Sequence, residues 1–121
     1  MSKILVIDDD LGTLSLVRTI LEDEGYEVVT AEDGETGIEK SQSDDFDLII
    51  LDIMMPRTDG FQVCHRLRTS PTTARIPVIM LTAWGYDLNR ERAEILGVKH
   101  FLTKPFLPRE LLDCIRKALA S

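Results

Sequence analysis

The sequence predicts an α/β fold in which a five-stranded parallel sheet carries five helices on its two faces. Short apolar runs alternate with amphipathic segments five times, as in successive β-α units. One run, residues 48–51, is apolar throughout, which is typical of a parallel strand covered on both faces. The 121 residues, 44% of them hydrophobic, suffice for one core, and we expect a single domain spanning residues 1–121.

The first two strands are each followed by a helix. Residues 3–7 are rich in Val and Ile and form the first strand, and residues 8–10 are three consecutive aspartates. One of these can cap the next helix, whose apolar residues recur at helical spacing until Gly25. Residues 26–31 are predicted as the second strand, and a short helix begins near Asp33.

The third and fourth strands both end in a polar residue. Residues 48–51 lead directly into Asp52, which is costly to bury and should lie where the strand leaves the sheet. Asp59 can cap the third helix. Residues 76–81 are predicted as the fourth strand, which ends at Thr82.

The last part of the chain repeats the alternation. A helix is expected from about residue 88 to residue 96, and residues 98–102 form the fifth strand, ending near Lys104. The last helix has Pro108 in its first turn. Leu107 occupies the cap position, although leucine is a poor capping residue.

Five strands with five helices favour the flavodoxin-like order 2-1-3-4-5 of doubly wound sheets. In this order the ends of the first, third, fourth and fifth strands meet at one edge, where such sheets bind ligands. The side chains at that edge are Asp8, Asp9, Asp52, Thr82 and Lys104. Three carboxylates so close together repel one another unless a cation lies among them, and an all-oxygen ligand set favours Mg²⁺ or Mn²⁺. The hydroxyl and the ammonium group add donors suited to a phosphoryl group.

Charge and cysteine content exclude several kinds of function. The formal net charge is −7, which argues against direct nucleic-acid binding by this domain. The two cysteines, Cys64 and Cys114, lie far apart and are expected to be free thiols in a reducing cytoplasm. The apolar run at residues 4–7 is too short for a signal peptide or a membrane span.

Four short motifs lie at these strand ends in chain order. They are Asp8-Asp9, Asp52 within LDIMMPRTDG, Thr82-Ala83, and Lys104-Pro105-Phe106. Each motif alone is weak, but the four together are specific. On these residues, over essentially its full length, the sequence resembles the receiver domains of two-component response regulators.

The resemblance implies a phosphoacceptor and a metal site. Asp52 would be the nucleophile that takes a phosphoryl group from a phosphohistidine of a sensor histidine kinase or phosphotransfer protein. Asp9, Asp52 and the backbone carbonyl of Met54 would bind Mg²⁺ directly, and Asp8 would act through a metal-bound water.

The resemblance also implies a conformational switch. Thr82 and Lys104 would hold the phosphoryl oxygens, and Phe101 would turn inward when Thr82 is drawn to the phosphate. The output surface would be the fourth helix, the fifth strand and the fifth helix, and a homodimer through that surface stays open. The Lys104–Pro105 bond would be cis. From its position two residues after Thr82, Trp84 is expected to form one wall of the crevice, and the alternative is that it packs outward against the fourth helix.

Three other functions are weighed against this switch, which is not a conventional enzyme. A magnesium-dependent phosphatase with an aspartate nucleophile generally carries a second acid two residues later, where this chain has Met54. A flavin-binding electron carrier needs a phosphate loop after the first strand, where this chain has three aspartates. A receiver-like scaffold that no longer takes phosphate usually lacks an acid or the lysine, and none is missing here.

Overall fold

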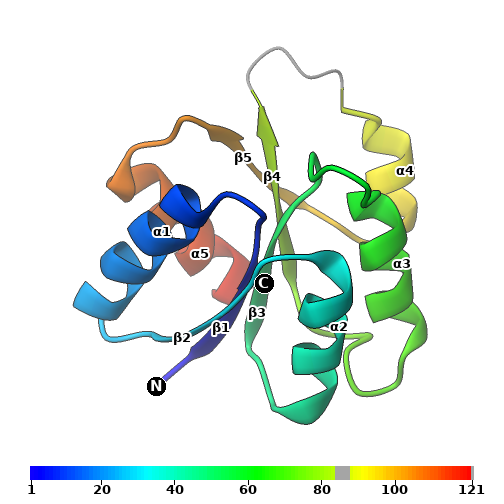
Figure 1. Ribbon diagram of the computed structural model, residues 1–121, viewed down its shortest axis with the longest axis horizontal. Helices are drawn as coiled ribbons and strands as arrows, with labels where there is room; N and C mark the ends of the chain where they lie inside the picture. The colour runs from blue at the N-terminus through cyan, green and yellow to red at the C-terminus, as the bar shows by residue number, and fades with distance from the viewer. Residues whose placement is uncertain (84–87, 121) are drawn as a thin grey trace.

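Five parallel strands form one sheet in the order β2–β1–β3–β4–β5 in the computed structural model, which describes residues 1–83 and 88–120 (Figure 1). The strands are β1 (Lys3–Ile7), β2 (Glu27–Ala31), β3 (Leu48–Asp52), β4 (Val78–Ala83) and β5 (His100–Lys104). The helices are α1 (Leu11–Asp23), α2 (Gly34–Ser43), α3 (Gly60–Thr69), α4 (Arg90–Ile95) and α5 (Pro108–Ala120). The predicted fold class and strand order are therefore confirmed.

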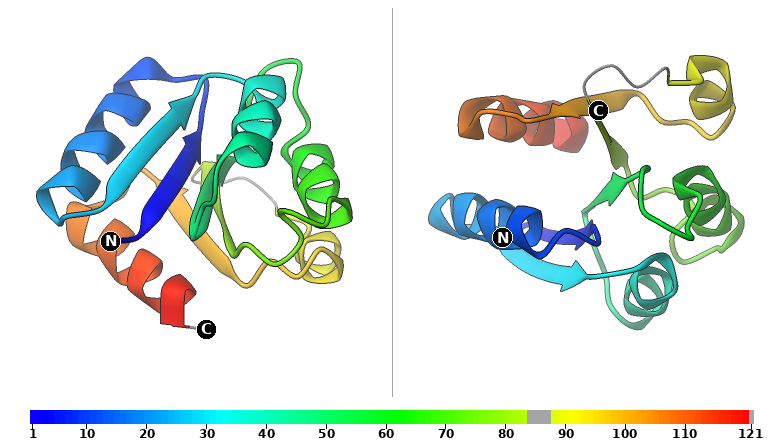
Figure 2. Two further views of the ribbon diagram at one scale, coloured as in Figure 1. Left: turned by 90° about the horizontal axis from the view of Figure 1, so that it is seen from below. Right: turned by 45° about the horizontal axis from the view of Figure 1, so that its top comes forward.

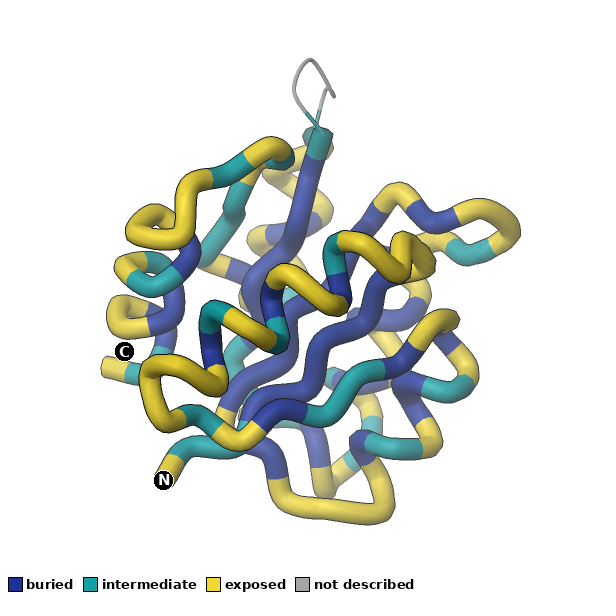
Figure 3. The backbone as a smooth tube through the Cα atoms, turned by 60° about the vertical axis from the view of Figure 1, so that its left-hand side comes forward, coloured by how far each residue is buried: buried dark blue, intermediate teal, exposed yellow. Residues whose placement is uncertain are grey.

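Different helices cover the two faces of the sheet. Figures 1 and 2 show α1 and α5 on one face and α2, α3 and α4 on the other. The side chains of β3 alternate between them: Leu48 and Ile50 join the core under α1 and α5, while Ile49 and Leu51 join the other core. All four are fully buried, which explains the unbroken apolar run in the sequence. Figure 3 shows the same arrangement, with buried strands inside helices whose outer faces are exposed.

Three strands begin later than the sequence predicts, and β2 does so by a single residue, at Glu27. β4 begins at Val78, because Pro77 has no N–H to donate to the sheet. β5 begins at His100, because the N–H of Val98 donates instead to the carbonyl of Ala93 and closes the preceding helix. At the carboxyl edge β4 ends at Ala83, one residue beyond the predicted end, and β5 ends at Lys104, as expected.

One helix begins later than predicted, whereas α5 begins at Pro108 as expected. α4 begins only at Arg90, since Asn89 is its cap and accepts a hydrogen bond from the N–H of Arg92. Before α5, the N–H of Leu107 donates to Oε1 of Glu110 at 2.7 Å. The glutamate thus supplies half of a capping box, which explains how leucine can precede the helix. No helix within residues 1–83 and 88–120 is long and apolar enough to cross a membrane.

Candidate functional site

The strand register brings the predicted polar residues to one edge of the sheet. It pairs Ile7 with Leu51, Asp52 with Leu81, Thr82 with Thr103, and Ala83 with Lys104. The carboxyl ends of four neighbouring strands therefore lie side by side, at the top in Figure 1. This is the edge at which open α/β sheets bind ligands.

Three aspartates form a cluster at this edge. Asp8, Asp9 and Asp52 each offer one carboxylate oxygen, and these oxygens all lie within 4.8 Å of one another. Asp8 has no exposed surface and Asp52 is 5% exposed, whereas Asp9 is exposed. The two buried acids come from the ends of adjacent strands, and the third is exposed to solvent.

Lys104 bridges the two buried acids. Its Nζ atom lies 2.6 Å from Oδ2 of Asp8 and 3.0 Å from Oδ2 of Asp52. The other oxygen of each acid accepts a backbone N–H from two residues further on, Asp10 for Asp8 at 2.9 Å and Met54 for Asp52 at 2.8 Å. Both carboxylates are therefore held in the same way, with their second oxygens turned toward one shared ammonium group.

The pKa values reflect burial and this shared cation. The pKa of Asp8 is raised to about 6. Burial is the largest cause and the nearby charge of Asp52 adds to it, whereas the hydrogen bonds from Lys104 and the Asp10 N–H act in the opposite direction. For Lys104, burial lowers the pKa, but the hydrogen bonds to Asp8 and Asp52 outweigh it and leave the pKa raised. Lys104 stays protonated, and Asp8 holds its proton to a higher pH than an ordinary aspartate does.

Thr82 lies on β4, next to the acid cluster, and is 8% exposed. Its Oγ1 is 3.4 Å from Oγ1 of Thr103, its register partner on β5. The sequence analysis did not single out Thr103. Its position directly before Lys104, on a strand predicted to end there, could have indicated a hydroxyl at this edge.

Phe101 is half-buried on β5, three residues before Lys104 and thus about 10 Å from it along the strand. The guanidinium of Arg90, the first residue of α4, lies over its ring, 4.8 Å from the centroid. The ring consequently lies between the sheet and α4 rather than within the acid cluster.

Several further expectations concern single residues. The Lys104–Pro105 bond is cis, as the resemblance implied. Cys64 and Cys114 are free thiols, and burial raises the pKa of each. The predicted role of Trp84 lies outside the described residues.

The donor set fits a hard divalent cation. Every member of the acid cluster offers a carboxylate oxygen, and such oxygens are the ligands that Mg²⁺ prefers. The carboxylate of Asp9 is exposed and can turn toward an ion, and a divalent charge would offset the repulsion among the acids. The residues present therefore suit magnesium better than zinc, which takes nitrogen and sulfur ligands.

Comparison with known proteins gives one consistent result. The family model of the response regulator receiver domain matches residues 4–116. The transcriptional regulatory protein ResD of Bacillus subtilis is 43% identical over 118 residues, which are 98% of this chain and 48% of ResD. The chain spans about half the length of such relatives.

Solved structures agree over the full chain. The chemotaxis protein CheY4 of Vibrio cholerae superposes with a TM-score of 0.92 at 34% identity, covering 98% of each chain. The receiver domain of the sensor histidine kinase PA1611 from Pseudomonas aeruginosa, solved with a magnesium ion in its active-site cleft, superposes with a TM-score of 0.88 at 27% identity, covering 99% of this chain and 98% of that one. The chain belongs to the response regulator receiver domain family, whose members are signalling proteins of two-component systems.

Proposed function

We propose that this chain is a phosphorylation-activated switch in which Asp52 accepts a phosphoryl group from a phosphohistidine of a sensor histidine kinase or phosphotransfer protein. The observation that carries the proposal is the bridging of Asp8 and Asp52 by Lys104 beside the exposed Asp9. A carboxylate nucleophile, a fixed cation and a set of oxygen ligands thus lie together at one edge of the sheet. Phosphoryl transfer depends mainly on such positioning and charge compensation.

The transfer itself needs few groups. A carboxylate oxygen of Asp52 attacks phosphorus as the bond from phosphorus to the imidazole nitrogen breaks, and the nitrogen keeps the electron pair. A proton carried by the other ring nitrogen, or taken up from solvent, neutralises this leaving group, so the products are an aspartyl phosphate and a neutral histidine. Lys104 already lies 3.0 Å from Oδ2 of Asp52, so it can compensate the charge of the incoming phosphoryl group. The hydroxyl of Thr82, on the neighbouring strand, would hold another phosphoryl oxygen.

Asp9, Asp52 and the backbone carbonyl of Met54 would hold Mg²⁺ directly, with Asp8 acting through water, and Mn²⁺ would fit the same ligands. When bound, the cation supplies positive charge to the phosphoryl oxygens. The chain's own contribution is to hold the acids in place. The Met54 N–H fixes one oxygen of Asp52, and the Asp10 N–H fixes one oxygen of Asp8.

The output of the switch would be a changed surface formed by α4, β5 and α5. Drawing Thr82 toward the phosphate would free space on β4, and Phe101 would turn inward to fill it. The proposal also includes recognition by the kinase and a homodimer through this surface. It further includes any effect of the surface on a transcription-regulating segment. The proposal does not include direct contact of this domain with nucleic acid, because its net charge is −7.

The decisive experiment is labelling with acetyl phosphate, followed by intact mass. Wild-type protein should gain one phosphoryl group when Mg²⁺ or Mn²⁺ is present and none in EDTA. Asp52→Asn should gain none, whereas Asp45→Asn, which removes an exposed acid far from the site, should label like wild type. Equal labelling of the Asp52→Asn protein would disprove the assignment.

A further inference from the structure

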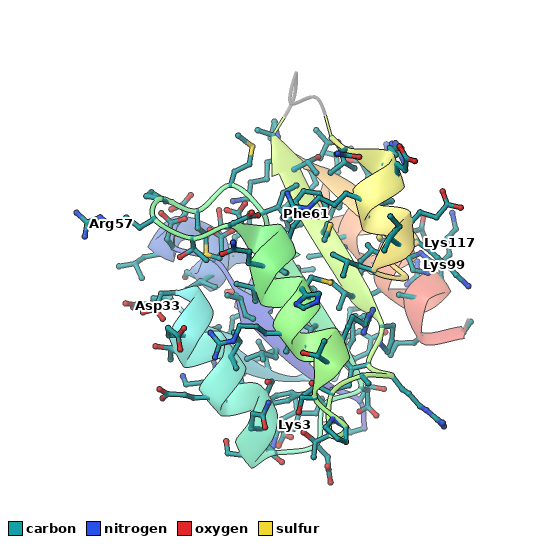
Figure 4. All side chains as sticks on the ribbon, turned by 90° about the vertical axis from the view of Figure 1, so that its right-hand side faces the viewer. Lys3, Asp33, Arg57, Phe61, Lys99 and Lys117 are labelled. Carbon is teal, nitrogen blue, oxygen red and sulfur yellow. The ribbon has the colours of Figure 1, made fainter. Side chains whose placement is uncertain are left out.

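A groove of about 580 Å³ lies at the opposite edge of the sheet from the acid cluster. Its walls are the end of α3, the loop before β4, the end of α4 and the start of β5, on the side of the molecule shown in Figure 4. We call it the basic groove, because its lining includes His65, Arg68, Arg75, Ile95, Lys99 and His100. It lies beside the first residues of β4 and β5, whereas Thr82 and Lys104 lie at the ends of the same strands.

Positive charge is concentrated here in an otherwise acidic chain. Every ionisable side chain that lines the groove in the described part of the chain is Arg, Lys or His, although the net charge of the protein is −7. Arg75 and Lys99 are exposed, and neither forms an ion pair within residues 1–83 and 88–120. Lys117 of α5 lies close to Lys99 in Figure 4 and lines an adjoining hollow with it, although Glu110 and Asp113 also line that hollow. These cations remain available for an external anion.

The groove is held in shape by the remaining arginine. Arg68 donates from Nε to the carbonyl of Leu96 at 2.8 Å and from Nη1 to the carbonyl of Ile76 at 2.6 Å. These bonds join α3 to the end of α4 and to the segment before β4. A ligand would therefore meet preformed walls, and binding would cost little ordering of the backbone.

One wall of the groove is apolar. Ile95, the last residue of α4, is 81% exposed, and the same isoleucine lines a second hollow between α3 and α4. An exposed isoleucine beside Arg75 and Lys99 matches a ligand that presents carboxylates next to an apolar side chain. A long polyanion such as nucleic acid is disfavoured, since it would also meet the repulsion of the acidic remainder of the domain.

We propose that the basic groove binds a short acidic peptide segment of a partner protein. Its carboxylates would pair with Arg75 and Lys99, and an apolar side chain would pack on Ile95. A short segment engages only local charge, because screening limits exposed interactions to about 8 Å at physiological salt. The groove shares no residue with the acid cluster, so the peptide would not contact Asp52, although Ile95 and His100 belong to α4 and β5 of the proposed output surface.

The test uses the ¹⁵N-labelled chain and the acetylated, amidated peptide Glu-Glu-Leu-Glu-Glu. We expect amide shifts at Gly97, Lys99 and His100 that saturate with peptide and weaken as salt rises. Lys99→Glu should raise the Kd about fivefold. Arg109→Glu makes the same charge change at an exposed arginine of α5 outside the groove, and it should leave the Kd unchanged.

Other outcomes would overturn the proposal. One is that the acidic peptide causes no saturable shifts at the groove, and another is that the uncharged peptide Gln-Gln-Leu-Gln-Gln binds as tightly as the acidic one. A third is that Arg109→Glu weakens peptide binding as much as Lys99→Glu does. The last is that a double-stranded DNA oligonucleotide binds more tightly than the peptide and shifts the same amides. Acetyl phosphate labelling of Lys99→Glu should equal that of wild type, and Asp52→Asn should bind the peptide like wild type. Failure of the groove proposal can therefore be told from failure of the phosphoacceptor proposal.

Discussion

The Nζ atom of Lys104 lies 2.6 Å from Oδ2 of Asp8, a carboxylate with no exposed surface. This contact does not fully offset the loss of hydration, since burial still raises the pKa of Asp8 from 3.8 to about 6. Without a divalent cation, ionisation of Asp8 therefore lowers the free energy of unfolding at neutral pH. A shift of this size corresponds to about 3 kcal/mol.

Asp8→Asn should stabilise the metal-free protein at pH 8 and lose this advantage at low pH. Between pH 3.8 and about 6 the native state binds the Asp8 proton more tightly than the unfolded state does. The wild-type free energy of unfolding therefore falls as pH rises through this range, whereas asparagine does not titrate. The difference between the two proteins should grow by up to about 3 kcal/mol. Urea denaturation in EDTA at pH 4 and pH 8 measures it, and a difference independent of pH would contradict the prediction.

Asp9 and Asp10 should separate metal binding from stability. Asp10 caps α1, accepting from the Gly12 N–H at 3.0 Å and the Thr13 hydroxyl at 2.9 Å. Asp10→Ala should lower the free energy of unfolding by about 1 kcal/mol with little change in Mg²⁺ affinity. Asp9→Ala should weaken Mg²⁺ binding and leave the free energy of unfolding nearly unchanged, because that exposed carboxylate belongs to the acid cluster. Mg²⁺ titration and denaturation of both variants check this, and equal Mg²⁺ affinities would place the ion elsewhere.

Lys104→Ala should destabilise the metal-free protein and weaken the switch. Removing the shared cation leaves two buried carboxylates without their partner, which costs about 3 kcal/mol. In the phosphorylated protein the phosphoryl charge would be less compensated, so NMR shifts at Thr82 and Phe101 should be smaller than in wild type. Lys99→Ala is the matched control at an exposed lysine. A wild-type pattern of shifts in phosphorylated Lys104→Ala would show that coupling does not pass through this residue.

The convergence of Asp8 and Asp52 was predictable because each ends or follows an apolar run typical of a buried strand, and Lys104 could be added because it ends the next predicted strand, although β5 is only partly buried. In a parallel sheet of known order, residues that follow neighbouring strands must meet. The side-chain partners were not predictable in the same way. Whether Lys104 pairs with one acid or bridges two depends on rotamers and burial, which periodicity does not determine.

The errors at element boundaries have local causes. Apolar residues at 76 and 98 were assigned to strands, although Pro77 cannot donate to the sheet and the N–H of Val98 closes α4. The spacing of Leu107 and Glu110 was available in the sequence, yet only half of the usual capping box is present, and the glutamate was not considered. Hydrophobic pattern located the elements, while backbone hydrogen bonds decided where each began.

The contact between Arg90 and Phe101 leads to a prediction about the switch. The guanidinium lies 4.8 Å from the ring centroid, and it would lose this contact if the ring turned inward toward β4. An exposed cation–π contact contributes roughly 0.5–1 kcal/mol. Arg90→Ala should therefore favour the inward state about two- to fivefold and tighten binding of the phosphoryl mimic beryllofluoride by the same factor.

Arg92 provides the control for this prediction, because it is on the same helix and makes the same kind of contact with a different ring. Its guanidinium lies 4.5 Å from the centroid of Phe61 on α3, and it pairs with Asp59 at 3.1 Å. Arg92→Ala loosens α4 without releasing Phe101, so beryllofluoride affinity should change little. Phe101 ring shifts and beryllofluoride titrations of the two variants measure the difference. If both tighten binding equally, general loosening of α4 controls the switch; if neither does, the Arg90 contact does not oppose the inward state.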